Sequence, residues 1–189
     1  MNYGINRLST RRLVYMAFLI ALSIILTRFL SIRITLSGVE GIRIGIGGLP
    51  IIFAGIVFGP LAGGIVGALS DFIGVMFFNL GGGAFMPHFT LTAFLTGFIP
   101  GLIVWNVFRR RIDYFSLLAA IGLGQLITSI ILVPLFLQNL FGVPLVGALP
   151  PRIITQLINI PLYSYLIKAI VCRDVFAFPE GESQELPCR

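Results

Sequence analysis

Charged side chains are scarce in this sequence of 189 residues, and their scarcity excludes a soluble protein. Only 11% of the residues are charged, whereas 57% are hydrophobic and the mean hydropathy is +1.02. A soluble domain carries roughly 25% charged residues. Most of the surface of this chain would therefore be apolar and would aggregate in water. The composition instead indicates a protein that sits in a lipid bilayer.

Sequence motifs that carry chemistry are also missing. The chain has no Walker A lysine motif, no HExxH motif, no nucleophile elbow and no pair of intramembrane carboxylates. Its one histidine, His88, does not make a metal site, because zinc needs several ligands. The net charge of +6 does not predict a nucleic-acid partner, because the arginines lie at the ends of apolar runs. We predict no enzyme activity, no cofactor and no metal.

The apolar runs are long and unbroken, which favours helices as the membrane-spanning element. We predict six transmembrane helices at about residues 13–29, 46–58, 61–78, 89–108, 114–137 and 150–171. Pro150 and Pro151 are placed in the first turn of the sixth helix, where proline is favoured. The predicted fold is an all-α integral membrane protein, with a six-helix domain over residues 1–172 and a mobile cytoplasmic tail over residues 173–189.

The distribution of basic residues predicts the orientation. If the N-terminus is cytoplasmic, the basic residues on the inside outnumber those on the outside, which satisfies the positive-inside rule. The inside set is Arg7, Arg11, Arg12, Arg109, Arg110, Arg111, Lys168 and Arg173, and the outside set is Arg28, Arg33, Arg43 and Arg152. Both termini are then cytoplasmic, in an inner or plasma membrane. Alternation at 32–36 and 42–44, around a turn at 37–41, predicts a structured outer hairpin.

A few polar residues inside the apolar runs are candidates for a binding site. Asp71 lies about ten residues into the third span, and intramembrane acids usually face the bundle interior and serve function. A structural ion pair or polar contact between helices is the alternative for Asp71. Arg152 and Gln156 lie one turn apart on the sixth helix. Arg152 either binds a carboxylate or is an interfacial residue that extends toward the lipid headgroups.

The start of the fourth helix supplies further candidates. Thr92 and His88 lie near its outer end, and Phe85 and Phe89 have rings that can stack on a flat ligand. The alternative for Thr92 is a bond to its own backbone, and for the phenylalanines it is lipid or core contact. Small residues four apart allow close helix packing, within the chain or against a partner subunit. These pairs are Gly63 and Gly67, Gly97 and Gly101, and Ala17 and Ala21.

Several segments together resemble a known family of membrane subunits. The AxxxA of Ala17 and Ala21 resembles the first-helix motif of the S-components of energy-coupling factor (ECF) vitamin transporters. GGLPIIFAGIVFGPLAGGIVGALSDFIG (47–74) is similar to the second and third helices of folate-specific S-components. GAFMPHFTLTAFLTGFIPG (83–101) is similar to their third loop and fourth helix. PPRIITQLINIPLYSYLI (150–167) resembles their sixth helix.

The resemblance implies a membrane subunit that captures folate from outside. Its partners would be a transmembrane scaffold subunit and two cytoplasmic ATPase subunits, and Ala17 and Ala21 would form the docking strip. The chemistry of folate is compatible with the candidate residues. Asp71 can accept the N–H groups of the pterin edge, and Phe85 or Phe89 can stack on its rings. Arg43 or Arg152 can bind its carboxylates.

Three other readings stay open at this stage. The first is an S-component for another vitamin or a queuosine-type precursor. The second is an autonomous channel or secondary transporter, although no filter repeat or internal repeat is evident. The third is a membrane enzyme, which the lack of a catalytic constellation disfavours. A panel of vitamin titrations separates the first reading from the folate hypothesis.

Overall fold

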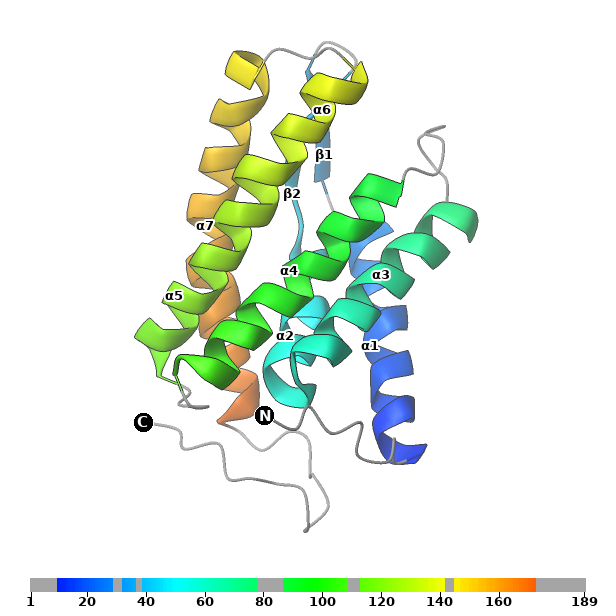
Figure 1. Ribbon diagram of the computed structural model, residues 1–189, viewed down its shortest axis with the longest axis vertical. Coiled ribbons are helices and arrows are strands. Elements are labelled where there is room, and N and C mark those ends of the chain that lie inside the picture. The colour runs from blue at the N-terminus through cyan, green and yellow to red at the C-terminus, as the bar shows by residue number, and fades with distance from the viewer. Residues whose placement is uncertain are drawn as a thin grey trace.

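The computed structural model describes residues 10–28, 32–36, 39–77, 87–108, 113–141 and 145–172. Its helices pack as a bundle around a short central helix (Figure 1). They are α1 (Thr10–Arg28), α2 (Leu49–Phe58), α3 (Pro60–Phe77), α4 (Pro87–Asn106), α5 (Tyr114–Gln125), α6 (Val133–Phe141) and α7 (Leu145–Val171). A 3-10 turn, η1 (Ile46–Gly48), precedes α2, and a π-helical segment, η2 (Leu126–Leu132), joins α5 to α6.

Five helical segments within the described residues are long and apolar enough to cross a membrane. They are α1, α3, α4, the run from α5 into α6, and α7. The second predicted span is shorter than a membrane helix, because α2 has only 10 residues. At 1.5 Å per residue, α2 extends about 15 Å, or half of the roughly 30 Å hydrocarbon core. The described residues thus contain five segments of spanning length and one short helix, α2, that packs against α1, α3, α4 and α7.

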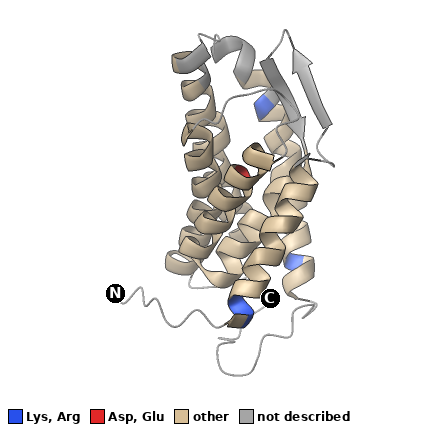
Figure 2. Cartoon of the chain, turned by 90° about the vertical axis from the view of Figure 1, so that its right-hand side faces the viewer, with Lys and Arg blue, Asp and Glu red and all other residues tan. Residues whose placement is uncertain are grey.

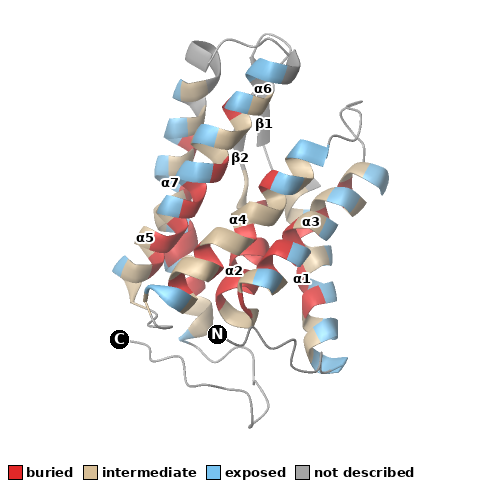
Figure 3. Ribbon diagram, in the orientation of Figure 1, coloured by how far each residue is buried: buried red, intermediate tan, exposed pale blue. Residues whose placement is uncertain are grey.

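The core of the bundle is centred on α2. Its residues are apolar on every side, and the eight from Leu49 to Ile56 are all buried. The helices α1, α3 and α4 pack around it, and buried positions gather there in Figure 3. The outward faces of the surrounding helices carry exposed apolar side chains instead. This pattern is expected of a bundle whose solvent is lipid, because the exposed apolar surface has no cost there.

Glycines allow α2, α3 and α4 to approach one another closely. A Cβ added at Gly55 on α2 would overlap the carbonyl oxygen of Gly97 on α4. A Cβ at Gly63 on α3 would in turn overlap the backbone of Gly55. Gly97 and Gly101 are likewise closed in by the backbones of Gly63 and Gly55. The small-residue pairs on the third and fourth helices therefore serve packing within the chain, as their spacing predicted.

The junction between α2 and α3 is a tight stop. Gly59 adopts φ 106°, a conformation that favours glycine, and Pro60 begins α3. Two side chains from other helices bind the last carbonyls of α2. The Trp105 Nε1–H donates to the Ile56 oxygen at 2.9 Å, and the Arg12 guanidinium donates to the Phe58 oxygen. These donors satisfy carbonyl groups that a helix end leaves without partners.

The predicted hairpin is present, and one predicted helix boundary is wrong. The strands β1 (Ile32–Leu36) and β2 (Val39–Ile44) pair antiparallel, with Arg33 opposite Arg43 and an irregularity after Ile34. The last helix begins at Leu145 rather than at Pro150, so both prolines lie inside it. Both prolines lie beyond the first four residues, whose N–H groups lack a partner in any helix, so each leaves the carbonyl four residues before it without its usual helical donor. The prolines therefore lie in the second turn of the helix and do not mark its start.

Candidate functional site

A polar cavity of about 160 Å³ lies inside the apolar bundle. It is bounded by α1, α4, α5, η2, α7 and the segment that connects β2 to α2, whereas α2 and α3 do not contribute to it. Its lining consists of Thr27, Gly45, Gly47, Gly48, Thr96, Gln125, Ser129, Gln156, Asn159 and Tyr163. Among the described residues, no charged side chain lines the cavity. The site is therefore built from amides, hydroxyls and backbone groups.

One face of α7 forms a wall of this cavity. Gln156, Asn159 and Tyr163 lie at positions i, i+3 and i+7, a spacing that places them on one side of a helix. The intervening Leu157 and Ile158 are 76% and 51% exposed and face away from the bundle. Asn159 and Tyr163 are both buried. Helix α7 thus separates a polar inner face from an apolar outer one.

The segment between β2 and α2 closes the cavity with backbone groups. The Tyr163 hydroxyl donates to the Gly45 oxygen at 2.6 Å, and the Ser23 hydroxyl donates to the Gly47 oxygen at 3.1 Å. A Cβ at Gly47 would overlap the Thr27 hydroxyl. Irregular backbone at membrane depth requires such partners, because lipid supplies none. The two hydroxyls therefore hold the segment against α1 and α7.

The third wall comes from the end of α5 and from η2. Gln125 is 5% exposed, and the Ser129 hydroxyl donates to its Oε1 at 3.0 Å. The Thr128 hydroxyl donates to the Gly124 oxygen at 2.8 Å. The Val133 N–H bonds to the Thr128 oxygen, five residues back, which is the π-helical pattern. Pro134, the next residue, lacks an N–H and crowds the preceding turn, which favours this wider winding.

Among the described members of the predicted binding set, one lines the cavity. Gln156 does so, and its Oε1 is buried without a hydrogen-bond partner among the described residues. Asp71 lies on α3, partly buried, and accepts a hydrogen bond from the Thr90 hydroxyl at 3.0 Å. Arg152 lies on α7 one turn before Gln156 and is also partly buried. Whether these side chains contact a ligand stays a prediction.

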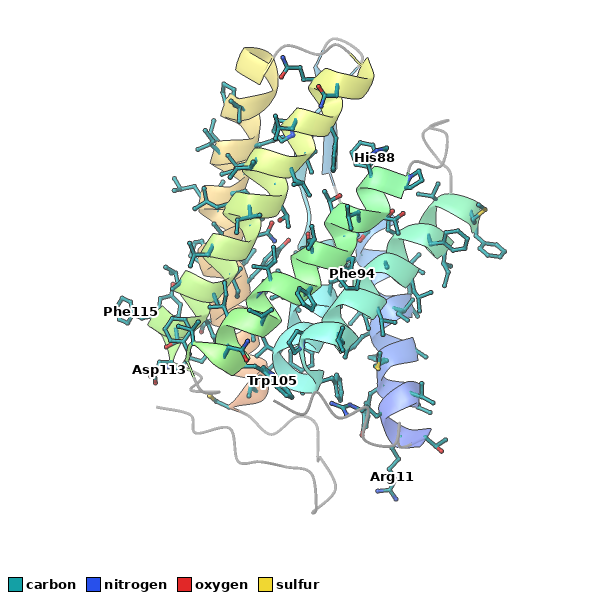
Figure 4. All side chains as sticks on the ribbon, viewed as in Figure 1. Arg11, His88, Phe94, Trp105, Asp113 and Phe115 are labelled. Atoms are coloured by element: carbon teal, nitrogen blue, oxygen red, sulfur yellow. The ribbon has the colours of Figure 1, made fainter. Side chains whose placement is uncertain are left out.

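The other predicted binding residues come from the start of α4. The Thr92 hydroxyl donates to the Phe89 oxygen at 2.7 Å, the backbone bond that the sequence offered as its alternative. His88 lies at the hairpin end of the bundle (Figure 4), exposed, with its ring 5.0 Å from that of Phe136. Phe89 is partly buried. Phe85 and the Arg43 side chain lie outside the described part of the structure.

Sequence reasoning missed most of the lining. Gln125, Asn159 and Tyr163 were not predicted, although a signal for the two amides was available. Each is a carboxamide inside a long apolar run, as Gln156 is, and a polar group in a spanning helix is a candidate for function. Within the described residues, no group of three or more histidine, cysteine, aspartate or glutamate side chains is placed to hold a metal ion.

The predicted docking residues lie on the outside of the bundle. Ala17 and Ala21 of α1 are both exposed, and so is Phe18 between them. Met16 and Leu19 on the other side of the helix are buried against the core. The two alanines are therefore available to lipid or to another membrane subunit, and they are not part of the internal packing.

Comparisons with known proteins agree with this architecture. The family described as "ECF-type riboflavin transporter, S component" matches residues 7–169. A curated relative, "Folate transporter FolT" of Clostridium novyi (strain NT), is 36% identical over 155 residues, which cover 82% of this chain and 84% of the relative.

Two solved structures share the fold. "Crystal structure of FolT bound with folic acid" superposes with a TM-score of 0.69 and 28% identity, over 84% of this chain and 91% of that one. "Structure and mechanism of the S component of a bacterial ECF transporter" gives a TM-score of 0.64 at 22% identity, over 86% and 96% of the chains, and supports the fold alone. With five helices apolar enough to cross a membrane among its described residues, this chain is a multi-pass membrane protein. It belongs to the S-component family of ECF-type transporters, whose members are substrate-binding membrane subunits and not enzymes.

Proposed function

We propose that this chain is the folate-binding S-component of an ECF-type transporter. It captures folate from outside the cell for uptake driven by partner subunits. The single observation that carries the proposal is the 36% identity to a folate transporter over 82% of the chain. The partners are a transmembrane scaffold subunit and two cytoplasmic ATPase subunits, which supply the nucleotide chemistry that this chain lacks.

The lining of the cavity supports an uncharged heterocycle as the buried part of the ligand. A carboxylate taken out of water needs a cation or several donors, and the described lining has no cation. Amides and hydroxyls suit the mixed donors and acceptors of a pterin ring. The cavity of about 160 Å³ is smaller than the roughly 300–1,000 Å³ of pockets that enclose a drug-sized ligand. Folate therefore enters it with its pterin end and leaves its glutamate end outside.

The remaining predicted residues are proposed to contact the outer part of folate. Arg152 lies one turn from Gln156 toward the hairpin end of α7 and can bind a carboxylate with two parallel hydrogen bonds. Arg43 of β2 is a second candidate for the same role. Asp71, Thr92 and the His88 end of α4 remain candidates for polar contacts, and Phe85 and Phe89 for ring contacts.

Charge at the two ends of the bundle supports a cytoplasmic location for both termini. Lys and Arg lie near the ends in Figure 2. Arg11 and Arg12 at the start of α1 lie at the same end as the last turn of α7, which contains Lys168 (Figures 1 and 4). The positive-inside rule assigns this end to the cytoplasm. The hairpin end then faces outward, in the plasma or inner membrane, where folate arrives.

The outward position of Ala17 and Ala21 supports their role as the docking strip for the scaffold subunit. Small side chains let a partner helix approach closely and gain dispersion contacts. Both residues are exposed and lie on either side of the middle of α1.

Riboflavin is the second candidate ligand, because the matching family is described by that vitamin. The test is calorimetric titration of the purified protein with folic acid and, separately, with riboflavin. We expect one folic acid per protein, with nanomolar affinity equivalent to about −12 kcal/mol, and no ATP hydrolysis. Saturation by riboflavin without binding of folic acid would refute the folate assignment and keep the family.

A further inference from the structure

We propose that Gln125 and Gln156 form a donor and acceptor pair that recognises a cyclic amide edge of the ligand ring, and that Ser129 sets the direction of Gln125. This proposal deepens the proposed function and rests on it. It concerns the part of the cavity that Gln125, Ser129 and Gln156 line from two neighbouring elements, α5 with η2 and α7.

The amide of Gln125 is held in one orientation. The Ser129 hydroxyl donates to Gln125 Oε1 at 3.0 Å, so the carbonyl side of this amide is occupied. The Nε2 group on the other side carries two N–H donors. Because Gln125 is 5% exposed, a half-turn of the amide would bring Nε2 to Ser129 and point Oε1 the opposite way. With the Ser129 bond as it stands in the structure, the group that Gln125 offers is a donor.

The amide of Gln156 offers the complementary group. Its Oε1 is buried and accepts no hydrogen bond among the described residues, and the side chain lines the same cavity. An acceptor that is hidden from water without a donor is unfavourable in a folded protein. A ligand N–H that reaches Oε1 removes this cost on binding. Gln156 thus presents an acceptor to the cavity that the Gln125 amide also lines.

A donor beside an acceptor matches a ring that carries C=O next to N–H. The pyrimidine ring of folic acid has this cyclic amide edge, with a carbonyl oxygen that takes the Gln125 N–H and a ring N–H that reaches Gln156 Oε1. In aminopterin an amino group replaces this oxygen, so a donor stands where the acceptor was and the ring nitrogen becomes an acceptor. Sites built to hydrogen-bond a given edge discriminate strongly against an analogue with the wrong groups.

Ser129 reaches Gln125 because side chains four residues apart are neighbours on a helix surface. Gln125 precedes the π-helical turn η2, and Ser129 lies inside it. Segments of π-helix occur often at functional sites, because they re-aim side chains within a helix. The neighbouring Thr128 hydroxyl is engaged with the Gly124 oxygen. Thr128 therefore does not compete for Gln125, and Ser129 acts on it alone among the described residues of this turn.

The test compares folic acid with aminopterin in calorimetric titrations of the purified full chain. The wild-type protein should bind folic acid at least about tenfold more tightly than aminopterin. Ser129→Ala should lower this ratio several-fold, because the Gln125 amide can then turn to offer either group. Ser129→Thr keeps a hydroxyl and should retain the wild-type ratio. Ser164→Ala is the matched control, because the Ser164 hydroxyl is buried and bonds the Ile160 oxygen away from the cavity.

The ratio of the affinities for folic acid and aminopterin distinguishes a positioning role of Ser129 from a merely structural one. Loss of folding in Ser129→Ala would lower both affinities together and leave their ratio unchanged, which would overturn the positioning role. Equal binding of both pterins by the wild-type protein would overturn the pair itself. Failure of both pterins to bind would refute the folate function instead. The role of Gln125 and Gln156 would then be tested with riboflavin and its N3-methyl derivative. Tighter binding of riboflavin would support the pair, and equal affinity for the two compounds would overturn it.

Discussion

Replacing Gly55 by alanine should destabilise the bundle far more than the same change at Gly122. Both glycines lie inside helices, so alanine gains about 0.5–1 kcal/mol at each from the lower flexibility of the unfolded chain. At Gly55 the new Cβ overlaps the Gly97 carbonyl, which is backbone and cannot rotate away. At Gly122 the nearest atom is the Ile160 Cγ2 at 3.8 Å, an ordinary contact. The two variants therefore differ only in the packing term.

The size of the packing cost depends on which atom the added Cβ overlaps. Adding a methyl group to a packed core costs about 1–3 kcal/mol, and the upper part of this range applies where backbone must move. For a chain of this length, 1 kcal/mol shifts the melting temperature by about 2–4 °C. The Gly55→Ala variant should therefore melt roughly 6–12 °C below the Gly122→Ala variant. Gly122→Ala itself should melt at or slightly above the wild-type temperature.

The assay is thermal unfolding of both variants in one detergent, followed by helical circular dichroism and by retention on size-exclusion chromatography. Folate binding at low temperature serves as a check, because neither glycine lines the cavity. Equal melting temperatures for the two variants would show that α2 and α4 do not approach as closely as described. A loss confined to ligand affinity would equally contradict the packing argument.

The remaining predictions concern the ligand and the partners. Asp71→Asn and Arg152→Ala should each weaken folic acid binding by about 2–5 kcal/mol in calorimetry, because the outer part of the ligand loses a charged, partly buried hydrogen-bond partner. Loss of thermal stability without ligand would instead make them structural residues. Ala17→Trp and Ala21→Trp should abolish folate uptake by cells that carry the scaffold and ATPase subunits, while binding by the isolated protein is kept. Normal uptake would leave the strip as lipid-facing packing, but the exposed position of both alanines already argues against an internal role.

The spans could be predicted because lipid imposes a simple requirement. Runs of apolar residues interrupted at Gly59 and Pro60 identified the helices, and alternation identified the β1–β2 hairpin. The start of α7 was missed because Pro150 and Pro151 were read as its first turn, whereas five residues precede them in the helix. Helix starts depend on contacts with other segments, which a local pattern does not contain.

The cavity was harder to predict, because apolar helices do not reveal which side faces inward. In a water-soluble helix the polar face points outward, but here both faces are mostly apolar. Gln156 was found as a polar residue beside Arg152, while Gln125 and Asn159 carried the same signal alone. Ser129 becomes informative only through its bond to Gln125, which the pattern of apolar residues does not report.

The helices that pack through glycines are largely separate from those that line the cavity, and this separation affects how ligand specificity can change in evolution. The trio α2, α3 and α4 meets through glycine backbones that tolerate no enlargement, whereas the cavity draws none of its lining from α2 or α3. Exchanges among amides and hydroxyls on α5, η2 and α7 can therefore accumulate without disturbing the frame. Proteins that retain the glycines of α2, α3 and α4 can therefore differ in the vitamin that they bind. A riboflavin family and a folate relative can thus share one fold.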